Sequence, residues 1–339
     1  MKTWPAFSIR KHPAAFCLLL ALLTAAAALA GLCIGAVNLP LSAVWSALLG
    51  RDTGSTAARI VLLTRVPRVC GGLLAGSALA VSGTLIQTVL NNPLASPHII
   101  GVNAGAGFLT ALSTALIPAA AWSAPLVAFL GAFLGVGLVL ALSERAGASR
   151  MSLILAGVAI SNIFTAGIDA IVTLSPDALN GYSDFRIGGL SGLTAARLFP
   201  AGVVIAAALL LALAMAGQLD ILALGQDTAQ SVGLPVKRAR LRLLLAAAAL
   251  AGATVSFAGL LSFVGLLVPQ MMRRILGGDS RPLLAASALG GALLLTLCDL
   301  LARTLFNPYE VPVGIVLSFV GGPFFLWLLF RQRGGRIHD

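Results

Sequence analysis

A few charged side chains stand inside long apolar stretches of this sequence, and they define the chemistry open to it. Asp169 lies in one such stretch, where a carboxylate either lines a hydrated path or forms a structural ion pair. Asp299 and Arg303 stand four residues apart, which places both on one face of a helix, where they can pair. Arg303 can instead join Arg65 and Arg68 in a basic patch that orients an acidic protein partner. The sequence leaves both alternatives open.

Patterns for catalysis or metal binding are missing. The sequence has no G-x-x-x-x-G-K-[ST] phosphate loop, no G-x-S-x-G and no H-E-x-x-H motif. Its three histidines, His12, His98 and His338, fall in loops or tails without a carboxylate partner nearby in sequence. We therefore expect no enzyme, no catalytic residue, no metal site and no directly bound cofactor. If transport is driven by ATP, a separate ATPase chain must use it.

The composition indicates that lipid is the solvent of this chain. Of its 339 residues, 59% are hydrophobic and 10% are charged, against roughly 25% charged residues in a soluble domain. The net charge of +11 would suit nucleic acid, but the basic residues fall between apolar blocks and only 6% of residues are aromatic. We expect a membrane protein that contacts lipid and binds no nucleic acid.

The apolar blocks predict an all-α polytopic membrane protein with about ten transmembrane helices in a single domain, 1–339. Each crossing needs about 20 apolar residues. The first block, 14–37, is too long for the core of a secretory signal, which has roughly 7–15 residues. The eighth is short and is expected to be interrupted by Gly265 and Pro269. The ten segments are 14–37, 66–90, 98–117, 123–143, 151–174, 198–217, 241–260, 263–276, 281–304 and 311–330.

Basic residues predict the orientation, because loops retained in the cytoplasm are rich in Lys and Arg. With both termini cytoplasmic, fifteen of the 22 basic residues lie inside. The other seven lie outside: Arg51, Arg59, Arg65, Arg68, Arg186, Arg197 and Arg303. This bias favours ten crossings with both termini cytoplasmic.

Two features of packing are also predicted. Gly72, Gly76 and Ala80 have the small-x-x-x-small spacing with which helices pack closely in lipid. The four cysteines, Cys17, Cys33, Cys70 and Cys298, form no C-x-x-C pair and are interpreted as small packing residues. A disulfide between Cys70 and Cys298 stays open, because both fall near the outer ends of their spans.

The hydrophilic connection 218–240 faces the cytoplasm in this arrangement. Its leucines and small apolar residues predict two short helices that are broken near Gly225 and Gly233. Either the connection is an ordinary solvated loop, or it is a platform on which a cytoplasmic partner docks.

Four long motifs in order along the chain resemble the permeases of ABC importers for iron-siderophores, haem and cobalamin, the FecCD type. They are TRVPRVCGGLLAGSALAVSGTLIQTVLNNPLASPHIIGVNAGAG (64–107), ILALGQDTAQSVGLPV (221–236), GLLSFVGLLVPQMMRRILGGDSR (259–281) and DLLARTLFNPYEVPVGIVLSFVGGPFFLWLL (299–329). The resemblance implies a bacterial inner-membrane protein with ten helices. It also implies three kinds of partner: a second permease copy or paralogue, two cytoplasmic ATP-binding subunits, and a periplasmic or lipid-anchored substrate-binding protein.

The resemblance also assigns sites. Arg65, Arg68 and Arg303 would meet acidic residues of the binding protein. A cytoplasmic gate would be formed by Asn92, Pro93 and Leu94 together with Met151 and Ser152, although the residues around 151 are less typical of the family. The loop 218–240 would hold the coupling helices that contact the ATPase. Its contact residues would be Leu224, Gly225, Gln226, Asp227, Ala229, Val232, Gly233 and Leu234.

One position departs from the family pattern. Gln270 follows Val268 and Pro269, where the family usually has His. Glutamine forms hydrogen bonds but does not become charged near neutral pH, so no protonation role is expected there.

The function expected from this resemblance is that of the transmembrane permease subunit of a binding-protein-dependent importer for a metal chelate. A secondary transporter driven by an ion gradient is the alternative, and it would make Asp169 the main residue of the pathway. A structural or signalling membrane protein is a further class, and it gives no reason for a helical platform at 218–240.

Overall fold

The structure is a computed structural model that describes residues 12–52, 54–117, 123–147, 149–306 and 309–333. All ten predicted segments contain a helix, and the described residues include no strand. These helices are α2 (Pro13–Cys33), α5 (Val66–Leu90), α6 (Val102–Leu116), α7 (Ala124–Arg145), α8 (Arg150–Leu174), α10 (Ala195–Ala214), α13 (Val236–Ala258), α14 (Val264–Leu276), α15 (Ser280–Thr304) and α16 (Val313–Arg333).

Seven helices of the described chain are long and apolar enough to cross a membrane. The shorter members are α6, α14 and the part of α16 from Val313 to Leu326. The all-helical polytopic class is therefore confirmed, whereas ten crossings with cytoplasmic termini stay a prediction. Four of the basic residues predicted inside, Lys2, Arg10, Lys11 and Arg336, lie outside the described residues, as does His338.

Six further helices lie between these segments. Three of them are not predicted by the sequence: α3 (Leu41–Leu48), α4 (Thr56–Arg59) and the π-helical turn η1 (Ile60–Arg65), which runs directly into α5. Pro67 explains the wide turn, because it has no N–H for the carbonyl four residues earlier and its ring crowds that carbonyl. The others are α9 (Ala178–Ile187), α11 (Ala216–Ala223) and α12 (Gln226–Ser231).

The core is centred on α5, which packs against α15, α13 and α14. A Cβ at Gly76 would lie 2.2 Å from the Gly291 carbonyl oxygen of α15, and one at Gly83 would lie 1.8 Å from the Gly265 oxygen of α14. Ala80 also lies against Gly291. Of the predicted small-x-x-x-small stripe, Gly76 and Ala80 thus lie at a close helix contact, whereas a Cβ at Gly72 would meet Thr296 of α15 only at an ordinary 3.6 Å.

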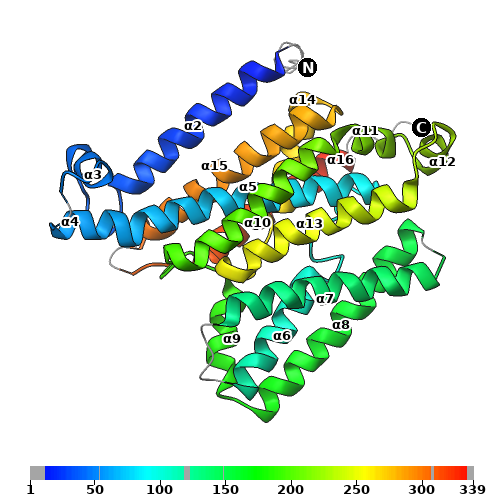
Figure 1. Cartoon of the computed structure of the whole chain (residues 1–339), viewed down its shortest axis with the longest axis horizontal. Coiled ribbons are helices and arrows are strands. Elements are labelled where there is room, and N and C mark those ends of the chain that lie inside the picture. The colour runs from blue at the N-terminus through cyan, green and yellow to red at the C-terminus, as the bar shows by residue number, and fades with distance from the viewer. Residues whose placement is uncertain (1–11, 53, 118–122, 148, 307–308, 334–339) are drawn as a thin grey trace.

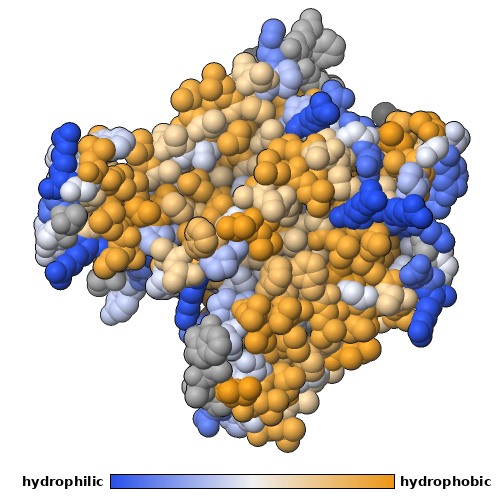
Figure 2. Space-filling model, in the orientation of Figure 1, coloured by the Kyte–Doolittle hydropathy of each residue, from blue (hydrophilic) through white to orange (hydrophobic). Residues whose placement is uncertain are grey.

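The helices form two groups (Figure 1). In one, α2, α5, α10, α13 and α15 lie side by side, and in the other α6, α7, α8 and α9 lie below them, joined by contacts of α13 with α7 and α6. Figure 2 shows a broad apolar surface with hydrophilic side chains gathered toward the two ends, at α3 and α4 on one side and at α11 and α12 on the other. This distribution suits a bundle that spans a bilayer. We call these the outer end and the inner end.

Two non-helical segments reach the middle of the bundle. Residues 91–101 leave the inner end of α5 and return to the level of Leu79, since a Cβ on Gly265 would lie 2.7 Å from the Leu79 oxygen and 3.5 Å from Pro97. Residues 259–263 descend from the outer end of α13 to the same level. The half-length helices α6 and α14 therefore both begin halfway along α5.

The predicted interruption of the eighth segment is placed differently in the structure. Helix α14 continues through Gly265 and Pro269, and the break precedes it. Pro269 has no N–H to donate to the Gly265 carbonyl, and the side-chain Nε2 of Gln87 donates to that oxygen instead, at 3.2 Å. A side chain from α5 thus satisfies the carbonyl that the proline leaves free.

Candidate functional site

A network of charged side chains lies at the outer end, between α2, α5 and α15. Asp299 accepts a hydrogen bond from Nε of Arg68 at 3.0 Å and forms an ion pair with Nε of Arg303 at 3.3 Å. The second carboxylate is Glu310, whose Oε2 lies 2.6 Å from Nη1 of Arg68. Asp299 and Arg303 thus form the ion pair that their spacing allows.

The three arginines do not form the exposed basic patch that the sequence analysis considered. Arg65, Arg68 and Arg303 are 4%, 6% and 4% exposed. Arg65 donates to the carbonyl oxygens of Leu32 and Val37, and Arg303 donates to that of Gly31. The physical reason is that three buried guanidinium groups need carboxylate and carbonyl acceptors, which α2, α15 and the segments that follow these two helices supply.

The arginines nevertheless share a cavity. A hollow of about 210 Å³ is lined by all three, by Glu310 and by the turn that follows α2. Glu310 was not among the predicted site residues, although it and Asp299 are the only acidic residues between 280 and 333. That scarcity of acids near three arginines is the signal that could have found it.

The cysteines are free thiols in the structure. Cys70 and Cys298 do not form the disulfide that was left open, and Cys298 is buried in the core. In addition, the described residues contain no group of three or more His, Cys, Asp or Glu side chains that could hold a metal ion.

The inner end carries the two short helices predicted within 218–240, now seen as α11 and α12. Gly225 and Gly233 adopt φ values of +110° and +86°, which break the chain where expected. Asp220 accepts a hydrogen bond from the Ser280 N–H of α15 at 2.8 Å, and Gln226 accepts one from Nη2 of Arg240 on α13 at 3.1 Å. Two bundle helices therefore fix this platform.

The platform presents apolar side chains away from the bundle. Leu224 is 68% exposed and Val232 is 64% exposed, whereas Ala229 is fully buried beneath them. Asp227 is exposed beside Leu224, and Leu234 is half-buried. Exposed apolar residues on short helices at the polar end of a membrane bundle are typical of a surface that another protein covers.

The candidate gate turn at the inner end of α5 is braced from α14. Asn92 closes a tight turn by accepting a hydrogen bond from the Leu94 N–H at 2.9 Å, and the Pro93 carbonyl accepts one from Nε2 of Gln270 at 2.6 Å. Gln270 is buried and lies 3.4 Å from Oε1 of Gln87. Gln270 thus has a clear structural contact in place of the histidine usual in the family.

The other gate candidates begin α8. Ser152 and Ser149 form a reciprocal capping box, and Met151 is 63% exposed. Five residues further along α8, Gly157 packs against the Ile99 carbonyl of the 91–101 segment, where a Cβ would lie 1.7 Å from the oxygen. The two candidate gate segments are therefore connected through this contact near the middle of the bundle.

Asp169 lies on an exposed face of α8. Asn162, Thr165, Asp169 and Thr173 are all exposed and follow one another at spacings of three and four residues, so they line one side of the helix. A polar stripe on an apolar helix points to a hydrated surface and not to lipid.

The fold is that of an all-helical polytopic membrane protein, with the two short helices α11 and α12 at its inner end. The FecCD transport family matches residues 21–331. This chain belongs to that family, whose members are the membrane-embedded permease components of ABC transporters.

Similarity to named transport proteins extends over most of the chain. The hemin transport system permease protein HmuU of Yersinia pestis is 38% identical, over 89% of this chain and 91% of the relative. The Fe(3+) dicitrate transport system permease protein FecD of Escherichia coli K12 is also 38% identical, over 94% and 99%. A solved ABC transporter described as of metal-chelate type, in an inward-facing conformation, matches with a TM-score of 0.84 at 26% identity over 93% and 98% of the two chains.

Proposed function

We propose that this chain is the permease subunit of a binding-protein-dependent ABC importer that carries an iron chelate across the bacterial inner membrane. The observation that carries this proposal is the inner platform, where Leu224 and Val232 are exposed on helices fixed to α13 and α15. A permease without its own ATPase needs such a contact to receive the motion of a separate one. Two ATP-binding subunits would dock on a pair of permeases, either two copies of this chain or this chain and a paralogue.

The cargo class follows from the relatives. HmuU and FecD are named for hemin and for ferric dicitrate. These names favour an iron-siderophore or haem-type chelate over cobalamin. We propose that the cargo passes along the polar stripe of α8 that contains Asp169, facing the second permease.

At the outer end, we propose that the binding protein docks over the cavity that contains Arg65, Arg68 and Arg303. A carboxylate of that protein would enter the cavity and displace Glu310 from Arg68. The exposed Arg51, Arg59, Arg186 and Arg197 would steer its approach.

The test is reconstitution with the ATPase and binding protein encoded beside the gene. The permease should retain the ATPase through purification, and proteoliposomes should take up ferric chelate only with ATP and the binding protein. Leu224→Asp should reduce ATPase retention roughly tenfold, as expected for the loss of an apolar contact at the centre of an interface. Leu49→Asp makes the same change at a 60% exposed leucine of the outer end and should retain the ATPase.

The rival mechanism makes opposite predictions. A secondary transporter would move substrate on an ion gradient without ATP, and Asp169→Asn would abolish that flux. In the importer, Asp169→Asn should leave ATP-driven uptake within about twofold of the parent, because an amide is still hydrated. Uptake on a gradient without any ATPase would overturn the proposed function.

A further inference from the structure

A cavity of about 300 Å³ lies where the two non-helical segments meet, halfway along α5. Four polar side chains line it: Ser96 and His98 from the first segment, Asn103 from the first turn of α6, and Ser262 from the second segment. The rest of its wall includes Leu79, Leu261 and Phe263. None of its lining residues is acidic, and none is lysine or arginine.

These polar groups have no partners in the bundle. Within the part of the chain that the structure describes, the side chains of Ser96, His98, Asn103 and Ser262 make no hydrogen bond. His98 and Ser262 are exposed, and the other two are half-buried. Polar groups at the depth of the hydrocarbon core are costly unless water or a ligand satisfies them. Four such groups around one hollow therefore indicate a hydrated site.

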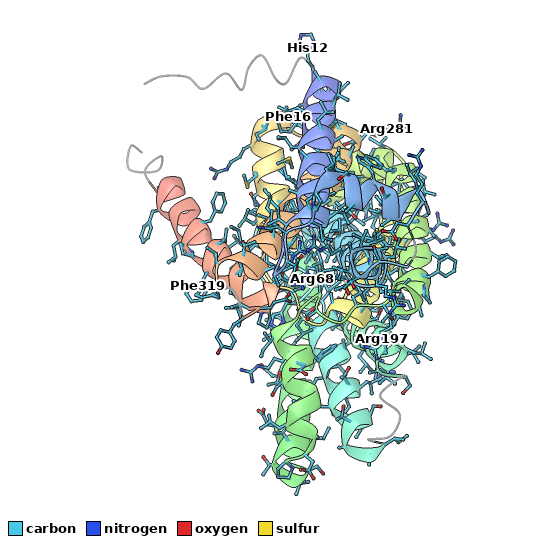
Figure 3. All side chains as sticks on the ribbon, turned by 90° about the vertical axis from the view of Figure 1, so that its left-hand side faces the viewer. His12, Phe16, Arg68, Arg197, Arg281 and Phe319 are labelled. Atoms are coloured by element: carbon cyan, nitrogen blue, oxygen red, sulfur yellow. The ribbon has the colours of Figure 1, made fainter. Side chains whose placement is uncertain are left out.

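Two further helices, α8 and α16, each pack against one of the two segments that form the cavity. Gly157 of α8 packs on Ile99, next to His98. Gly321 of α16 packs on Phe263, next to Ser262, where a Cβ would lie 2.4 Å from the ring. In Figure 3, α8 (green) lies below the central helices and α16 (red) lies to their left. Cargo that moves between them along the polar stripe of α8 would pass this cavity.

The chemistry of the cavity favours an oxygen-rich anion. The imidazole, the amide and the two hydroxyls all offer N–H or O–H donors, and no carboxylate competes for them. The apolar wall suits the organic body of a ligand, as in most small-molecule sites. The absence of a fixed positive charge keeps binding weak, which a transit site requires because cargo must also leave.

We propose that this cavity is a transit site for the carboxylate rim of an anionic iron chelate, with His98 as its principal hydrogen-bond donor. The inference rests on the proposed function and adds a specificity-determining residue to it. Chelates with peripheral carboxylates are retained at mid-depth, and chelates without them pass the cavity unrecognised. The permease thus adds its own selection to that of the binding protein.

The test measures occupancy without transport. The permease with Ser262→Cys, in lipid nanodiscs, is treated with a charged methanethiosulfonate reagent, and labelling at residue 262 is quantified by peptide mass spectrometry. Ser262→Cys should react readily, whereas Leu210→Cys, at a 68% exposed position of the apolar helix α10, should not. Ferric dicitrate should slow labelling at 262 roughly tenfold, as expected for hydrogen bonds to a charged group. A ferric trihydroxamate without carboxylates should leave it unchanged.

Variants of His98 then assign the donor. His98→Ala in the Ser262→Cys chain should abolish protection by ferric dicitrate, and His98→Gln, which keeps an N–H donor, should retain part of it. His12→Ala is the matched control at an exposed histidine before α2. Lack of reaction at residue 262, equal protection by the trihydroxamate, or protection that survives His98→Ala would each overturn the proposal. Because neither ATP nor the binding protein is present, these outcomes are independent of the uptake experiment that tests the function.

Discussion

The two ends of the bundle differ in which side chains they bury and which they expose. At the outer end, charged side chains are turned inward, and Asp299, 2% exposed, lies between Arg68 and Arg303. At the inner end, apolar side chains are turned outward, and Leu224 and Val232 are more than half exposed. The outer end thus buries charged groups, and the inner end exposes apolar groups to water.

The two ends therefore differ in whether their side chains find partners within this chain. The outer network satisfies its own charges within one chain, so it fixes how α2, α5 and α15 meet. The inner platform leaves apolar surface uncovered, and this is the surface that the proposed ATPase would cover. Substitutions at the outer end should therefore act on stability, and those at the inner end on association.

The largest expected effect is at Asp299. Its replacement in Asp299→Ala leaves Arg68 and Arg303 buried without their shared carboxylate, which should reduce the free energy of unfolding by about 3–5 kcal/mol. Thermal unfolding of the purified permease in detergent measures the loss. The control is Asp177→Ala, at an exposed aspartate that precedes α9 and whose side chain makes no capping hydrogen bond. Equal stability of the two variants would contradict a structural role for the network.

A smaller loss is expected in the core that both ends share. Gly83→Ala places a methyl group against the Gly265 carbonyl and should force α5 and α14 apart, at a cost of about 1–3 kcal/mol. Gly137→Ala on α7 meets no atom within 4 Å and should be neutral or slightly stabilising. The same unfolding measurement separates the two, and a neutral Gly83→Ala would show that these helices can move apart freely.

Glu310 combines features of both ends, because it is ion-paired within the chain and also partly exposed. Its side chain is 38% exposed, and Arg68 keeps Asp299 when Glu310→Gln removes the second ion pair. The loss of stability should stay below about 1 kcal/mol. Affinity for the binding protein should rise roughly two- to fivefold, because a competing carboxylate is removed from the cavity. Surface plasmon resonance measures that affinity, and a decrease would show that Glu310 itself contacts the partner.

The smallest effect on stability is expected at the platform. Leu224→Asp should change the free energy of unfolding by less than about 0.5 kcal/mol, because the side chain touches little of its own chain. Thermal unfolding of the permease alone checks this value beside the loss of ATPase retention. A large destabilisation would show that Leu224 supports the bundle, and the contrast between the two ends would fail.

Much of the fold is readable from the sequence because hydrocarbon imposes simple rules. Apolar blocks with few charges locate all ten helical segments, and Gly225 and Gly233 mark the breaks around α12. The small-residue spacing in α5 predicts its close contacts. Each of these signals is local or has a fixed period, so one sequence is enough to see it.

The missed features depend on contacts between distant segments. The sequence around Arg65 does not indicate that the carbonyls of Leu32 and Val37 accept its hydrogen bonds. Its burial was therefore not predicted. The pairing of Glu310 with Arg68 spans 242 residues. The depth reached by 91–101 was hidden as well, because an apolar segment without charges has the same composition whether it crosses the membrane or turns back within it.

The two segments that turn back at mid-depth also set the electrical insulation of the membrane around this protein. Where 91–101 and 259–263 meet, peptide groups and polar side chains occupy the layer that hydrocarbon fills elsewhere. The barrier to small ions along this wall is therefore thinner than the bilayer. In the proposed pair of permeases, the seal that prevents leakage would come from closure between the two chains and from the turn held by Gln270.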